Sequence, residues 1–263
     1  MLANSLEEKS LESLKTKDFF SEFKWDGIRA QIIFSKSGKI YSRNGDNITK
    51  SFPDLNVNQN FFAVIDGELV IKKDSIQSFN NLQKRIGRKN VDKKILEKFP
   101  IHFIAYDILF ESNTDLRNQP LKIRRNKLEK FITSLNHSNI SLSPLINFKS
   151  WNELKSIRES SLNNHIEGVM LKNKFSEYKK GRNSNGWYKW KRNPFLFDFI
   201  IMYAQRGHGK RSSFFSDFTF GCWLDHNHNK LVPVGKSYSG FTNDELKKLD
   251  KWVRSNIVER FGP

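Results

Sequence analysis

The sequence predicts an α+β fold, with antiparallel sheets flanked by helices and a small β module towards the C-terminal end. Short stretches in which apolar and polar residues alternate, typical of strands, recur along the chain. Amphipathic helical stretches are interspersed among them, which favours the α+β class. At 263 residues, the chain suits one large domain or two smaller ones and can bury a sizeable core.

The N-terminal half begins with residues 1–18, which we expect to form a lead-in of marginal order. The stretch IRAQIIFSKSGKIYSR (28–43) predicts a β-hairpin that turns at Ser37-Gly38. FFAVIDGELVI (61–71) predicts a second unit of this kind, broken at Asp66-Gly67. A basic helical stretch is expected within 77–99, and IHFIAYDILF (101–110) predicts a strongly apolar strand.

Two helices and two further strands are predicted in the middle of the chain. LKIRRNKLEKFITSL (121–135) carries leucine and isoleucine on one helical face. SWNELKSIRESSL (150–162) opens with a capping box formed by Ser150 and Glu153. HIEGVMLK (165–172) and GWYKWKR (186–192) predict short strands.

Pro194 predicts a domain boundary, so we expect three segments, 1–18, 19–195 and 196–263. The last segment holds a strand in FDFIIMYAQ (197–205), a basic loop RGHGKR and a hairpin in DFTFGCWLDHNHNKLVPVGK (217–236). It ends in an amphipathic helix capped by Thr242 and Glu245.

Composition favours a polyanionic partner, most often nucleic acid, because 45 Lys and Arg against 28 Asp and Glu give a net charge of +17. The alternative is a generally solvated basic surface. No stretch approaches the ~20 apolar residues of a membrane span, and the N-terminus lacks an apolar signal core. Cys222 is the only cysteine, which excludes an intrachain disulfide and a cysteine-based zinc cluster. We expect a cytoplasmic protein without a membrane partner.

Lys24, in SEFKWDGIRAQ, is the first candidate for chemistry. An exposed lysine is protonated at neutral pH and is a poor nucleophile, so it needs burial or neighbouring cations to become reactive. Taken alone, the tetrapeptide K-x-D-G is also consistent with a lysine that simply lies beside a strand turn and has no chemical role. Arg29 and Arg43 lie on the two strands of the predicted hairpin, whose pairing would bring both towards Lys24 as a phosphate clamp.

Further charged positions follow at short turns and strands. Glu68 lies in DGELV, Glu167 in IEGVML, and Lys189 and Lys191 alternate in WYKWK. Each has a structural alternative, as a hairpin turn, a strand start or an amphipathic strand. Together, the order K-x-D-G-x-R, S-R, D-G-E, A-Y-D, E-G-V-M and K-x-K resembles the covalent nucleotidyltransferase superfamily of DNA ligases, RNA ligases and capping enzymes.

More narrowly, EFKWDGIRAQ, FIAYDIL, EGVMLK, WYKWKR and the downstream VGKSYSGFTNDELKKLDKWV resemble bacterial and archaeal ATP-dependent DNA ligases. The resemblance runs from about residue 19 to the C-terminal end. It implies a nucleotidyltransferase (ATP-grasp-like) adenylation domain over 19–195 and a partial OB-fold over 196–263. It also implies a role in sealing nicks during DNA replication, repair or recombination.

The resemblance implies a role for each matching residue. Lys24 matches the lysine that attacks the α-phosphate of ATP and forms lysyl-AMP. Glu22 matches the residue that recognises the adenine amino group. Arg29 matches a residue near the ribose and the 5′-phosphate of DNA, and Arg43 matches another phosphate-contacting arginine.

Further matches complete the implied nucleotide site. Glu68 resembles the carboxylate that holds the ribose or a metal, and Glu167 the carboxylate that organises the metal. Tyr106 matches the ring that stacks on adenine, and Met170 the soft platform on its other face. The implied cation is Mg²⁺ or Mn²⁺, which keeps several waters and therefore needs no tight ligand cluster.

Lys189 and Lys191 match the pair that holds the α-phosphate. Arg182 resembles a family arginine before this pair, but it precedes Lys189 by seven residues, one more than the usual spacing. A solvated loop arginine is the alternative there.

We expect the sequence to depart from the family pattern towards both ends of the chain. We expect no helical DNA-binding domain before the core, and the last 65 or so residues suggest only part of an OB-fold. The resemblance then implies weak self-adenylylation, in a monomer or in a form completed by a second polypeptide.

Nicked duplex DNA is the expected partner. The basic residues of 84–94 (Lys84, Arg85, Arg88, Lys89, Lys93, Lys94) and of the 206–211 loop (Arg206, His208, Lys210, Arg211) could contact phosphates or form solvated surface. His226 and His228 lie in a predicted hairpin turn, which argues against a metal site. The alternatives to a DNA ligase are an RNA ligase or capping-type enzyme and a non-catalytic protein that binds nicks.

Overall fold

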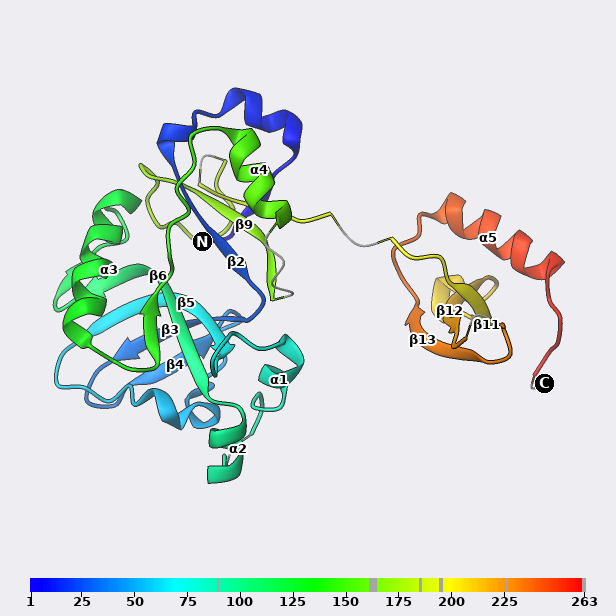
Figure 1. Cartoon of the computed structure of the whole chain (residues 1–263), viewed down its shortest axis with the longest axis horizontal. Helices are drawn as coiled ribbons and strands as arrows, with labels where there is room; N and C mark the ends of the chain where they lie inside the picture. Colours follow the sequence, from blue (N-terminus) through cyan, green and yellow to red (C-terminus); the bar gives the residue numbers. More distant parts are fainter. Residues whose placement is uncertain (89, 161–164, 185, 194–195, 226, 262–263) are drawn as a thin grey trace. The chain divides into compact units, whose positions relative to one another are not determined.

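The computed structural model describes residues 1–88, 90–160, 165–184, 186–193, 196–225 and 227–261 (Figure 1). The chain forms two compact units, Met1–Asn193 and Pro194–Pro263, which are described separately. The sequence predicts a boundary at Pro194, and the second unit begins at this residue.

The first unit contains a six-stranded sheet in the order β4 (Lys39–Ser42), β3 (Ile28–Phe34), β5 (Ala63–Ile71), β6 (Ile101–Glu111) and β7 (Thr114–Asp115), with β8 (Ile140–Leu142) also paired to β6. All of these pairs are antiparallel except β6 with β8. Helix α3 (Leu121–Leu135) packs Leu128 and Phe131 into the core of this sheet. The predicted hairpin, apolar strand and helix are confirmed.

A second, four-stranded sheet has the order β1 (Asn4–Ser5), β10 (Trp187–Lys191), β9 (Ile166–Asn173) and β2 (Phe19–Trp25). Helix α4 (Trp151–Ser160) contributes the buried Leu154 to the core of this sheet. The chain passes from β2 to β3, and so from one sheet to the other, at Asp26-Gly27. A Cβ at Gly27 would lie 2.3 Å from the carbonyl oxygen of Leu69, so the crossing requires glycine.

The prediction of marginal order for residues 1–18 is wrong. This segment contains β1 and two 3₁₀ helices, Glu8–Ser13 and Thr16–Asp18, and belongs to the first unit. Leu6 and Leu11 are buried in the core of the four-stranded sheet, and Asn4 pairs with Tyr188 of β10. Pairing with a distant strand orders the segment.

The predicted break at Asp66-Gly67 is also wrong, because β5 runs unbroken through this dipeptide and only the register with β6 shifts there. A Cβ at Gly67 would lie 2.4 Å from the Phe103 ring, so this glycine permits close approach of β6 instead of a turn. Within 77–99 the chain forms two short helices, α1 (Phe79–Gln83) and α2 (Lys93–Lys98). Two 3₁₀ turns, Thr49–Ser51 and Pro53–Leu55, precede β5.

The second unit is an antiparallel sheet of β11 (Ile200–Arg206), β12 (Phe215–Trp223) and β13 (Leu231–Ser237), with a 3₁₀ turn at Gly209–Arg211. Helix α5 (Asn243–Ser255) starts with the predicted capping box of Thr242 and Glu245. Its Leu246 and Val253 pack against Phe218. The assignment of this unit to a partial OB-fold stays a prediction. Within the described residues, we find no helix with the length and apolar character that a membrane crossing needs.

Candidate nucleotide site

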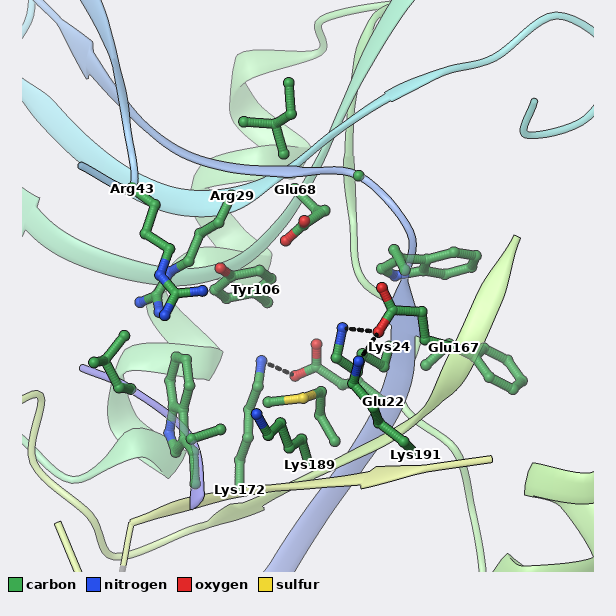
Figure 2. Close-up of a pocket in the computed structure, with 18 of the residues that line it drawn as sticks. Glu22, Lys24, Arg29, Arg43, Glu68, Tyr106, Glu167, Lys172, Lys189 and Lys191 are labelled. Atoms are coloured by element: carbon green, nitrogen blue, oxygen red, sulfur yellow. Dashed lines mark hydrogen bonds and ion pairs between the residues drawn. The ribbon is translucent and has the colours of Figure 1, made fainter. Parts of the chain in front are cut away.

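A cavity of about 470 Å³ in the first unit is lined by residues of both sheets (Figure 2). Strands β2, β9 and β10 contribute from the four-stranded sheet, and β3, β5 and β6 from the six-stranded sheet. The structure brings every predicted site residue to this cavity, namely Glu22, Lys24, Arg29, Arg43, Glu68, Tyr106, Glu167, Met170, Arg182, Lys189 and Lys191. A volume of this size is typical of small-molecule sites.

Strand register explains how residues distant in sequence meet. Met170 of β9 pairs with Glu22 of β2 on one side and with Lys189 of β10 on the other. Gly168 pairs in the same way with Lys24 and Lys191. Because cross-strand partners share a face and side chains alternate along a strand, these positions all project from one face of the sheet.

Gly168 is required at the centre of this arrangement. It has φ +145°, and a Cβ would lie 2.3 Å from the carbonyl oxygen of Trp190 and 2.8 Å from Cα of Lys191. The absent side chain lets β10 approach β9 closely. The side chains of Lys24 and Lys191 can therefore both reach the carboxylate of Glu167.

Lys24, Glu167, Lys189 and Lys191 form a group that we call the lysine cluster. The Lys24 Nζ lies 2.6 Å from Oε2 of Glu167, and the Lys191 Nζ lies 3.0 Å from the same oxygen. Burial tends to raise the pKa of Glu167, but the two ammonium groups outweigh it and lower this pKa. Glu167 therefore remains a carboxylate that orients Lys24.

Lys189 differs from its two neighbours, because it has no ion pair among the described residues. Partial burial and the surrounding cations, in order Lys191, Arg182, Lys24 and Arg43, lower its pKa. Such an excess of positive charge around one lysine favours an anionic ligand.

Arg29 is already engaged by protein groups. Its guanidinium donates two hydrogen bonds to Asp66, at 3.1 and 2.6 Å, and one to the Tyr178 hydroxyl at 3.1 Å. It also donates to the backbone carbonyl of Met1 at 2.5 Å. Arg43 also lines the cavity, and its guanidinium forms no hydrogen bond or ion pair with the described residues. Of the two predicted phosphate contacts, Arg43 is therefore the more available.

Glu68 projects from β5 towards the cavity and forms no hydrogen bond or ion pair with the described part of the chain. Burial raises its pKa to about 8, although Lys24 and Arg29 act in the opposite direction. A half-buried carboxyl group without a fixed partner is suited to a ligand hydroxyl group or a cation.

Glu22, Tyr106, Lys172 and Trp187 form a second group, which we call the Glu22 cluster. The buried Lys172 ammonium lies 3.0 Å from Oε1 of Glu22 and 4.0 Å from the centre of the Tyr106 ring. Tyr106 packs edge-on against Trp187, with ring centres 5.7 Å apart. Sequence reasoning missed Lys172, although its position two residues after Met170 on a strand places both on one face.

Two other candidate features fall outside this cavity. Arg85 is fully buried and pairs with Asp54 at 2.6 Å, so it is not available to a DNA phosphate. His228 stacks on Trp223, and His226 lies outside the described residues. Lys89 and the side chain of Lys210 also lie outside the described part of the chain. No group of three or more His, Cys, Asp or Glu suited to a metal occurs in the described ranges.

Comparison with known proteins gives a consistent result. The family described as "ATP dependent DNA ligase domain" matches residues 1–191. The "Probable DNA ligase" of Koribacter versatilis is 29% identical and is matched over 100% of this chain and 50% of its own length. The "DNA ligase" of Archaeoglobus fulgidus is 31% identical over 92% of this chain and 44% of its own.

A solved structure of a Lig E DNA ligase, titled "DNA binding with a minimal scaffold", has a similar fold. Its TM-score is 0.68 at 20% identity, over 94% of this chain and 86% of that one. The predicted α+β nucleotidyltransferase fold is confirmed. The chain spans about half the length of the first two relatives. On the match over residues 1–191, the chain belongs to the ATP dependent DNA ligase domain family.

Proposed function

We propose that the chain takes the adenylyl group of ATP onto Lys24 and uses it to seal nicks in duplex DNA. The observation that carries this proposal is the convergence of Lys24 and Lys191 on one oxygen of Glu167, inside a cavity lined by every predicted site residue. The family match over residues 1–191 supports ATP as the nucleotide.

The Glu22 cluster, together with the neighbouring Met170, binds the base of the nucleotide, and the lysine cluster binds its phosphates. Tyr106 and Met170 offer flat and polarisable surfaces to the adenine ring, while Glu22 accepts a hydrogen bond from its amino group. Lys189, without a carboxylate partner, binds the α-phosphate together with Lys191 and neutralises the charge that develops there.

The chemical step is a displacement at phosphorus. The Lys24 ammonium first loses a proton, because it attacks with a nitrogen lone pair, and Glu167 at 2.6 Å is the nearest acceptor. The nitrogen then bonds to the α-phosphorus while the bond to the oxygen bridging to the β-phosphate breaks. Pyrophosphate leaves with that electron pair, and a lysyl-AMP phosphoramide remains.

The carboxylates fit the implied Mg²⁺ or Mn²⁺. Glu68 is half-buried without a partner among the described residues, and a cation beside it would stabilise its charged form. Glu68 and Glu167 would hold the ion, with waters completing its shell. When bound, the ion neutralises polyphosphate charge.

DNA is the proposed acceptor of the adenylyl group, which activates a 5′-phosphate for attack by the neighbouring 3′-hydroxyl group. The net charge of +17 supports a polyanionic partner. Exposed basic residues such as Lys93 of α2 are available to phosphates, whereas the buried Arg85 is not.

Incubation with ATP labelled at the α-phosphate tests the first step. We expect mass spectrometry to place the AMP label on Lys24, and we expect no label in Lys24→Ala. Lys93→Ala, which removes an exposed lysine of α2, is the matched control and should label normally. Adenylate found on another residue, or an equally labelled Lys24→Ala protein, would contradict the proposal.

Nicked substrates test the second step. Sealing of a nicked DNA duplex carrying a 5′-adenylate, without added ATP, is expected from the wild-type chain. A preference for a nicked RNA duplex would instead identify an RNA ligase. Binding to nicks without sealing would identify a non-catalytic protein.

A further inference from the structure

Arg182 lies in the connection between β9 and β10 and takes no part in the steps proposed above. Its side chain is exposed, lines the cavity and forms no ion pair or hydrogen bond within the described residues. Partial burial, Lys191 and Arg182 together lower the pKa of Lys189, so the charge of Arg182 acts on the lysine cluster. A long side chain without a partner has many rotamers, so its backbone must be fixed if its charge is to stay there.

The segment that contains β1 lies along this connection and along β10. The backbone N–H of Leu2 donates to the Gly181 carbonyl at 2.7 Å, and Leu2 forms a parallel bridge with Arg182. Further along, the backbone N–H of Leu6 donates to the Lys189 carbonyl at 3.0 Å. Leu6 is buried in the core of the four-stranded sheet, which anchors the segment. The segment therefore joins the connection that carries the arginine to the strand that carries the lysine.

Asn4 adds a side-chain contact from the same segment. Its Nδ2 donates to the backbone carbonyl of Asn183 at 2.8 Å, and this carbonyl also accepts from the backbone N–H of Gly186 at 3.3 Å. Asn4 pairs with Tyr188 of β10, so the two side chains share one face of the sheet. The Tyr188 hydroxyl donates to the carbonyl of Ser184. Two neighbouring side chains thus hold consecutive carbonyls of the turn directly after the exposed arginine.

We propose that Asn4, assisted by Tyr188, is a positioning residue that holds Arg182 beside the lysine cluster, where its guanidinium binds a phosphate of ATP. This inference rests on the proposed function, which brings the polyphosphate to Lys189 and Lys191. A guanidinium binds phosphate through directed hydrogen bonds, often two in parallel, so the placement of its backbone matters. A loop held at the carbonyls before and after the arginine loses little conformational entropy when the phosphate binds.

A double-mutant cycle on the full chain tests whether Asn4 acts through Arg182. The measured quantity is the second-order rate constant of lysyl-AMP formation below saturating ATP. Asn4→Ala releases the Asn183 carbonyl and should lower this constant about fivefold. Arg182→Met removes the phosphate contact and should lower it about thirtyfold. The double variant should stay near thirtyfold, because Asn4 then has no guanidinium to position, whereas independent effects would multiply to about 150-fold.

Two further variants complete the design. Ser5→Ala is the matched control and should react like wild type, because Ser5 is exposed on the same strand and forms no side-chain hydrogen bond within the described residues. Tyr188→Phe releases the neighbouring carbonyl but keeps the ring that packs edge-on against Phe19. It should also lower the constant without multiplying the effect of Arg182→Met. Circular dichroism checks folding, and the Tyr188 cycle decides the question if Asn4→Ala does not fold.

The outcomes separate this inference from the proposed function. A wild-type rate constant in folded Asn4→Ala, or a loss that multiplies with that of Arg182→Met, overturns the positioning role. If the wild-type chain binds ATP but never labels Lys24, the proposed function fails, and calorimetric ATP affinities of the same four proteins complete the cycle. A non-additive loss of affinity would then retain the positioning role. Equal affinities, or no binding of ATP by the wild-type chain, would overturn both proposals.

Discussion

The Glu22 cluster and the lysine cluster line the same cavity but handle charge in opposite ways. The side chains of Glu22 and Lys172 are 4% and 2% exposed and form a close pair. Those of Lys24, Glu167 and Lys191 are 21%, 32% and 56% exposed, and two lysines share one carboxylate. Lys189 adds a further cation without a partner among the described residues.

This difference suggests a division of labour. The Glu22 cluster is fixed before a ligand binds, which suits recognition of a rigid base at little cost in ordering. The lysine cluster has excess positive charge and access to solvent, so it is completed only by an anion such as a polyphosphate. Changes in the lysine cluster should therefore affect the rate of adenylylation, and changes in the Glu22 cluster should affect the affinity for nucleotide.

Lys189→Met gives the largest expected effect and tests the lysine cluster. It removes the cation that has no internal partner, so we expect the rate of lysyl-AMP formation at saturating ATP to fall about 100-fold. The free energy of unfolding should not decrease, because the variant relieves repulsion among neighbouring cations. Rapid-quench labelling and thermal unfolding measure the two quantities.

Lys93→Met is the control for this variant, since Lys93 is 89% exposed on α2 and should leave the labelling rate unchanged. A Lys189→Met protein with a normal rate and weaker ATP affinity would show that the lysine cluster only binds. The proposed division between the two clusters would then be wrong.

Glu68 sharpens the comparison, because it is half-buried, less so than Glu22, and unpaired within the described residues. Burial raises its pKa from 4.5 to about 8 in the folded chain. Between roughly pH 4.5 and 8 the unfolded chain therefore binds fewer protons than the folded chain, and the free energy of unfolding falls as pH rises. Above this range the loss is complete.

Glu68→Gln should remove this dependence. We expect the variant to gain stability relative to wild type by about 3–4 kcal/mol between pH 5 and pH 8, as measured by urea unfolding at each pH. Glu97→Gln on α2 is the matched control and should follow the wild-type profile. Parallel pH profiles for Glu68→Gln and wild type would show that Glu68 ionises normally in the fold.

Local signals in the sequence were sufficient for much of the fold. The alternation in 28–43 and the capping box at Thr242 depend on neighbouring residues, and both are found as predicted. The order of residues 1–18 and the unbroken β5 could not be predicted in this way. They depend on pairing with β10 and on the contact of Gly67 with Phe103, which join distant parts of the chain.

The candidate site shows the same limit. Its residues were predicted from the resemblance of several motifs to those of a known family, and the cavity brings all of them together. The pattern could not show that Arg29 is held by Asp66 and Tyr178, or that Arg85 is buried against Asp54. Such partners are set by packing between elements, whereas the positive charge of each arginine is equally visible in the sequence whether it is buried or exposed.

Tyr106→Phe has the smallest expected effect and separates two functions of this residue. The Tyr106 hydroxyl donates to Asp66 at 3.2 Å, but Asp66 also accepts from Arg29 and, at 2.6 Å, from Tyr178. Loss of one of these bonds should cost about 1 kcal/mol of stability and leave ATP affinity within about fivefold, because the ring and its stacking face remain.

Tyr106→Leu provides the contrast, since it removes the ring as well as the hydroxyl group. It should weaken ATP binding by about tenfold or more, consistent with stacking worth 1–3 kcal/mol per base, while the rate at saturating ATP changes little. If Tyr106→Phe lost as much affinity as Tyr106→Leu, the hydroxyl group and its hold on Asp66 would govern binding. The Glu22 cluster would then recognise the base through the network around Arg29 instead of through the ring.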